Sequence, residues 1–107
     1  MGPTEDQLRQ AVLEAVNEGL LILGESSRKA IYFHLQNIVA LKMEDIPENL
    51  ETFKEGLERI FGKGAETIEK SIIRTLHAKL GIEYKEEECS EFVECVHRAI
   101  ENFKARD

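Results

Sequence analysis

The sequence lacks tryptophan and has only two prolines and two cysteines among its 107 residues. Few prolines leave long segments free to form helices, and two cysteines are too few for a disulfide framework. The longest apolar run, Leu20–Leu23, is too short to span a membrane. The acidic, polar start of the chain does not resemble a signal peptide. We therefore expect a cytoplasmic protein, with disorder at residues 1–3.

Excess positive charge is also missing. The net charge is −7, and no segment between predicted helix breaks carries more than one net positive charge. Proteins that bind duplex nucleic acids neutralise phosphates with lysine and arginine. Nucleic-acid binding is therefore disfavoured, although a small folded basic patch would escape such a count.

The residues that are present favour helices. Apolar residues make up 42% of the chain, enough for one modest core, and they recur at helical spacing. We expect one domain over residues 1–107: an all-α, compact bundle of about five amphipathic helices. The first runs from a capping box at Thr4 and Gln7 to about Leu23, with a small-residue edge that lets another helix approach.

Turn signals divide the rest of the chain. Gly24 is predicted to cap the first helix, and Ser26 or Ser27 to begin a second, central helix that ends near Lys42. Pro47 predicts a break before a third helix capped by Asn49. The remaining expected helices span about 65 to 80, ended by Gly81, and a last segment that carries both Cys89 and Cys95.

Histidine and cysteine are the candidate reactive residues. His34 lies at the edge of its apolar stripe beside Tyr32, whereas His77 and His97 lie well away from theirs, and we favour structural or surface roles for all three. Cys89 and Cys95 on one helix would lie about 9 Å apart along its axis, beyond disulfide reach. We therefore expect free thiols, and we predict no catalytic residue, no cofactor and no metal site.

Three other features have simple structural readings. Gly62-Lys63-Gly64 before a helix lacks the full P-loop pattern, so it is read as a helix stop and restart. The acidic run from Glu86 to Glu94 lacks calcium-loop spacing and is read as a solvated face. The basic pair Arg28-Lys29 is expected to form salt bridges with the acidic first helix. The five phenylalanines are assigned to the core and not to a ligand box.

The stretch from Leu23 to Ser26, running into Ala30–Leu35, resembles the archaeal helical family called Nitrosopumilus output domains. The segments Asp45–Asn49 and Leu57–Ala65 continue the likeness, which covers roughly residues 18–85. The resemblance implies a small archaeal helical domain whose relatives occur alone or attached to signalling modules. It provides no catalytic or ligand residue, and we expect no receiver or sensor domain within these 107 residues.

The leading hypothesis is a non-enzymatic interaction or regulatory domain with a signal-output role. A protein partner or a second copy would dock on an apolar surface, and the tentative contacts are Arg28, Tyr32 and His34. One alternative is a DNA-associated transcriptional regulator that uses Arg28-Lys29 or residues 63–79. The other is a small-ligand binder or enzyme built around His34 and Tyr32.

Overall fold

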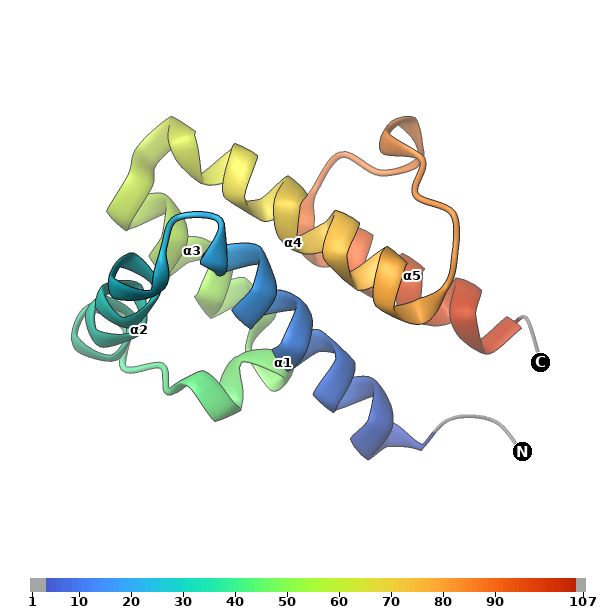
Figure 1. The fold of residues 1–107 in the computed structure, drawn as a ribbon, viewed down its shortest axis with the longest axis horizontal. Coiled ribbons are helices and arrows are strands. Elements are labelled where there is room, and N and C mark those ends of the chain that lie inside the picture. The colour runs from blue at the N-terminus through green and yellow to red at the C-terminus, as the bar shows by residue number, and fades with distance from the viewer. Residues whose placement is uncertain (1–3, 106–107) are drawn as a thin grey trace.

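The computed structural model describes residues 4–105, which form five α-helices and three short 3-10 helices (Figure 1). In chain order these are α1 (Glu5–Leu21), α2 (Glu25–Val39), η1 (Met43–Glu48), α3 (Leu50–Phe61), η2 (Gly62–Gly64), α4 (Ala65–Leu80), η3 (Glu86–Glu88) and α5 (Phe92–Ala105). The predicted all-α bundle is confirmed. Residues 1–3, for which the sequence predicts disorder, lie outside the described residues.

The first connection differs from its prediction. The capping box is confirmed, because Gln7 N donates to Thr4 Oγ1 at 3.1 Å and Thr4 N donates to Gln7 Oε1 at 2.9 Å. However, α1 ends at Leu21, and Gly24, at φ 95° and ψ 155°, directly precedes α2. The positive φ of Gly24 turns the chain sharply enough for α2 to start at Glu25. Neither serine is therefore the cap.

The second connection begins earlier in the chain than predicted, because α2 ends before Lys42. Helix α2 ends at Val39, because Ala40 adopts a left-handed conformation at φ 55° and Leu41 N donates to Leu35 O at 3.3 Å. Asn49 precedes α3 as predicted, but its side chain donates to Asp45 O at 2.9 Å instead of capping the helix. Gly62, at φ 58°, ends α3 as predicted.

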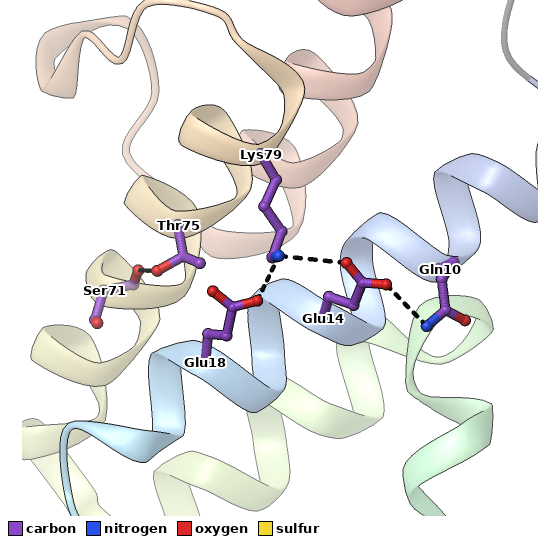
Figure 2. Close-up of polar contacts among 6 residues, drawn as sticks. All are labelled: Gln10, Glu14, Glu18, Ser71, Thr75 and Lys79. Atoms are coloured by element: carbon purple, nitrogen blue, oxygen red, sulfur yellow. Dashed lines mark hydrogen bonds and ion pairs between the residues drawn. The ribbon is translucent and has the colours of Figure 1, made fainter.

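Helices α1 and α4 run antiparallel at the centre of the molecule (Figure 1). The small-residue edge predicted for the first helix has the predicted effect: a Cβ built on Gly19 would lie 2.7 Å from Ile72 Cγ1 and 3.0 Å from Ile72 Cα. At the exposed edge of this contact, Lys79 Nζ lies 3.3 Å from Glu14 Oε1 and also pairs with Glu18 (Figure 2).

The core lies between α1, α3, α4 and α5, not around α2. The largest fully buried side chains come mainly from those four helices: Val16, Leu20, Phe53, Leu57, Ile72, Leu76 and Val96. Only Ile31 and Leu35 of α2 are buried. The prediction of α2 as the central helix is therefore wrong. In the sequence, the apolar residues of α2 lie on several sides of the helix, which suggests that neighbours surround it. In the structure some of these residues are exposed.

The C-terminal half follows the predicted order. Helix α4 spans Ala65–Leu80 as expected, and Gly81, at φ 68°, ends it. Helix α5 begins at Phe92, so Cys89 precedes the helix in extended backbone. This shift of the helix start changes the chemistry of the two cysteines, as described below.

Candidate functional site

The three tentative contact residues all lie on α2, but they do not converge. Arg28 and Tyr32 lie on the side that packs near α1, whereas His34 is exposed. Tyr32 is half-buried, and its hydroxyl donates a hydrogen bond to Asn17 Oδ1 of α1. Burial raises the pKa of Tyr32 to about 12, against a smaller opposing effect of Arg28. Neither Tyr32 nor His34 lines any of the main cavities formed by residues 4–105.

The Arg28 guanidinium does not pair with the first helix, which corrects the sequence prediction. Its Nη2 lies 3.2 Å from Glu25 Oε1 on its own helix. Its Nε is enclosed and donates to no group in the described part of the chain. The pairing is local because Glu25 lies three residues earlier, where helical geometry brings the two side chains together.

Large exposed apolar side chains are confined to one region of the described chain. Leu21, Ile22, Leu23, Phe33, Ile38 and Met43 are each at least 38% exposed, and all of them fall within residues 21–43. We call these six side chains, together with α2, the α2 surface. It comprises the end of α1, the whole of α2 and the start of η1 (Figure 1).

Phe33 is the most exposed of these residues, at 66%. At 100° per residue it points almost directly away from Ile31 and Leu35, which face the core. Its ring makes an edge contact with His34, with the ring centroids 5.9 Å apart. No neighbour within residues 4–105 buries this phenylalanine, so its position on α2 has no explanation in packing.

The charge of this region also differs from that of the rest of the chain. Residues 21–43 contain three basic residues and one acidic residue, whereas the other 84 contain 11 basic and 20 acidic residues. Glu25, the single acidic residue, already pairs with Arg28. Lys29 and Lys42 form no ion pair with the described residues. The α2 surface is thus apolar and weakly positive on an acidic protein.

A second candidate site is a cavity of about 280 Å³ between α4 and the start of α5, which we call the α4–α5 cavity. Cys89 and Cys95 both line it and form a disulfide with a Cα–Cα distance of 5.6 Å. The prediction of free thiols is therefore wrong. It assumed that both residues lie on one helix, but Cys89 lies three residues before α5 in extended backbone and folds back over the first turn.

Glu69 of α4 lines the same cavity and is the ionisable group that sequence reasoning missed. It is half-buried, and its Oε2 is enclosed and accepts no hydrogen bond from residues 4–105. Burial, and then the negative charge of Glu58, raise the pKa of Glu69 to about 7. The signal was available: helical spacing puts Glu69 among the apolar positions Ile72, Ile73 and Leu76.

Other charged groups around this cavity are paired. Lys70 Nζ lies 2.9 Å from Glu86 Oε1 and 3.3 Å from Glu66 Oε1. The Glu91 carboxylate begins α5 by accepting from Val93 N at 3.0 Å and from Glu94 N at 3.1 Å. Partial burial opposes ionisation, but these hydrogen bonds and Lys54 hold the pKa of Glu91 below its usual value. The acidic run is therefore more than a solvated face.

The two remaining histidines have no role in either candidate site. His77 is only 8% exposed, with Nδ1 2.8 Å from Ile73 O and an edge contact to Tyr84 at 5.1 Å. Its spacing predicted a more peripheral place, but residues 82–84 fold back over it. His97 is exposed. Within residues 4–105 no cluster of His, Cys, Asp and Glu is arranged to hold a metal ion.

No family model, curated protein or solved structure matches this chain. The likeness to Nitrosopumilus output domains therefore stays a prediction. None of the helices within residues 4–105 has both the length and the apolar character that crossing a bilayer requires.

Proposed function

We propose that the protein is a non-enzymatic interaction domain that uses the α2 surface to bind an amphipathic helix with acidic side chains beside its apolar ones. The observation that carries this proposal is the gathering of all six large exposed apolar side chains of the described residues within positions 21–43. Contiguous exposed apolar patches commonly mark interaction sites, and the proposal is that these side chains contribute to one.

Charge selects the kind of partner. Lys29 and Lys42 flank the exposed apolar groups without ion-pair partners among residues 4–105, and the other residues of the chain are strongly acidic. An acidic amphipathic helix would complement these lysines and be repelled from the remaining surface. Laid along α2, two turns of it would span the roughly 12 Å from Glu25 to Phe33.

The two alternatives from the sequence gain less support. Of the two basic segments proposed for DNA, residues 63–79 are largely engaged: Lys70 and Lys79 pair with carboxylates, and the Arg74 guanidinium lies 5.8 Å from the centre of the Tyr84 ring. In the other segment Arg28 pairs with Glu25, which leaves Lys29 as its single unpaired cation among residues 4–105. A ligand site built on His34 and Tyr32 would need side chains that converge, and these two project to different sides of α2. We therefore propose neither.

Photo-crosslinking in cells tests the proposal. A benzophenone amino acid is placed at Phe33 or Ile22 and, as matched controls, at the exposed positions Arg74 and Glu101. We expect crosslinks from positions 33 and 22 to one acidic amphipathic segment, and none to that segment from the controls. Crosslinks only to second copies of the chain, or equal crosslinks from all four positions, would contradict the proposal.

A signal-output role is supported only by the resemblance to Nitrosopumilus output domains. We propose it as a consequence of partner binding at the α2 surface. The partner would then belong to a regulatory assembly. Identification of the crosslinked segment tests this as well.

A further inference from the structure

The α4–α5 cavity brings the disulfide together with the carboxyl group of Glu69, whose Oε2 has no hydrogen-bond partner among residues 4–105. Cys89, Cys95 and Glu69 all line it. A shallower cavity of about 730 Å³ adjoins it and shares Glu69 and Phe92 with it, so Glu69 lies where the two meet. This arrangement gives a small molecule a route from solvent to the disulfide.

The disulfide is poorly placed to hold the fold together. It joins residues only six positions apart, so it closes a short loop. Short loops restrict the unfolded chain least. Helix α5 is already attached to the core through Phe92, Val96 and Ala99, which are at most 4% exposed.

The two sulfur atoms differ in their surroundings. Cys89 is partly exposed, whereas Cys95 is only 8% exposed and lies in the first turn of α5. An attacking thiolate therefore reaches Cys89 more readily, and Cys95 is the sulfur that leaves.

We propose that Cys89–Cys95 is a redox-active disulfide that exchanges with small thiols entering the α4–α5 cavity. In this site the Glu69 carboxyl group supplies a proton to the departing Cys95 thiolate. The exchange is stoichiometric, so it adds a redox-responsive site to the proposed interaction domain and does not require enzymatic turnover.

The electrons and protons balance as follows. A thiolate attacks Cys89 Sγ, the bond between Cys89 and Cys95 breaks, and a mixed disulfide forms on Cys89. The Cys95 thiolate takes the proton of Glu69, whose carboxylate is then reprotonated by solvent. A second thiolate attacks the small-molecule sulfur of the mixed disulfide and releases Cys89 as a thiolate, which takes a proton from solvent. Two small thiols are oxidised to their disulfide, and the protein disulfide is reduced to two thiols.

The charges around Glu69 suit a proton donor. Lys54 and Glu58 face it from α3, Glu91 faces it from the start of α5, and Glu66 lies one turn earlier on α4. Three of these four groups are acidic, and only Lys54 opposes them. Burial, and then these negative surroundings, keep the carboxyl group protonated at pH values at which an exposed glutamate has lost its proton.

The test measures the rate at which reduced glutathione opens the disulfide of the full chain between pH 5.5 and 8.5. Alkylation of released thiols and mass spectrometry follow the reaction, and rates are divided by the concentration of glutathione thiolate. We expect Glu69→Gln to slow opening at least about tenfold at pH 6 and to leave it unchanged at pH 8.5, where Glu69 has no proton to give.

Two further variants make the result decisive. Glu86→Gln removes a carboxylate that lines the same cavity but is not among the charges that act on Glu69, so it should leave the pH profile unchanged. Glu69→Ala, which also lacks an acid, should reproduce the loss seen with Glu69→Gln. A profile that is the same with and without Glu69 would overturn the proposal. So would an equal loss in Glu86→Gln, or a native disulfide that glutathione does not open at any pH in the range.

Discussion

The hydroxyl group of Tyr32 donates a hydrogen bond to Asn17 Oδ1 and so ties α2 to α1. The next residue, Phe33, is 66% exposed and points away from this contact. One turn of α2 therefore has an anchored inner side and a free outer side. The inner side explains how α2 is held, and the outer side provides the surface that we propose for docking.

Tyr32→Phe should lower the free energy of unfolding by about 1 kcal/mol, because it removes one half-buried hydrogen bond and leaves the ring in place. Urea denaturation measures this change. A double-mutant cycle with Asn17→Ala is the control, since the cost of Tyr32→Phe should largely disappear once its acceptor is gone. An equal cost in both backgrounds would show that the hydrogen bond contributes nothing.

Gly19→Ala should destabilise the protein by about 1–3 kcal/mol, because the new Cβ would meet Ile72 at 2.7 Å and its backbone Cα at 3.0 Å. Gly64→Ala is a matched control: Gly64 has φ −67°, and the nearest atom to its added Cβ is 3.8 Å away. Thermal unfolding should separate the two variants clearly. Similar melting temperatures would contradict the close approach of α1 and α4.

Glu69 should make stability depend on pH. Its folded pKa of about 7 lies above the ordinary value of 4.5, so the folded state holds the proton more tightly. The stability that Glu69 contributes is therefore complete below about pH 4.5 and is lost as the pH rises through 7. Solvent screens this half-exposed group, and we expect a loss of about 1 kcal/mol between pH 5 and 8.

This loss is measured against Glu69→Gln by chemical denaturation of the oxidised protein at several pH values. The variant should lack the decline between pH 5 and 8, while Glu86→Gln, which removes a carboxylate from the same cavity, should retain it. If the unaltered protein and Glu69→Gln declined in parallel, the raised pKa of Glu69 would be refuted.

Removing the disulfide should lower the stability of the protein only modestly. Replacing both Cys89 and Cys95 with serine should lower the free energy of unfolding by about 2 kcal/mol, the value expected for so short a loop. The far-ultraviolet circular dichroism should change little, because the buried Phe92, Val96 and Ala99 still hold α5. Loss of the α5 signal would mean that the disulfide, and not the core, positions this helix.

The sequence predicted those features that depend on neighbouring residues. The capping box at Thr4, the limits of α4 and the stop at Gly81 all follow from local spacing and turn chemistry. The predictions failed where distant segments meet. Burial of His77 depends on Tyr84 folding back over α4, and the disulfide depends on where α5 begins, three residues after Cys89.

The candidate sites were less predictable than the fold. Phe33 was assigned to the core because most phenylalanines are buried, and only packing shows that α2 turns it outward. Glu69 occupies an apolar position of α4, which was a readable signal. Its raised pKa, however, results first from burial and then from the charge of Glu58 on α3, and local spacing reveals neither.

Chemical-shift mapping tests the central claim, docking on the α2 surface, most directly. The probe is a synthetic helical peptide with leucines on one face and glutamates beside them, titrated into isotope-labelled protein. We predict shift changes concentrated in residues 21–43 that weaken with added salt and are lost in Phe33→Ser. Changes centred on α4 or α5, or changes that persist in Phe33→Ser, would contradict the account.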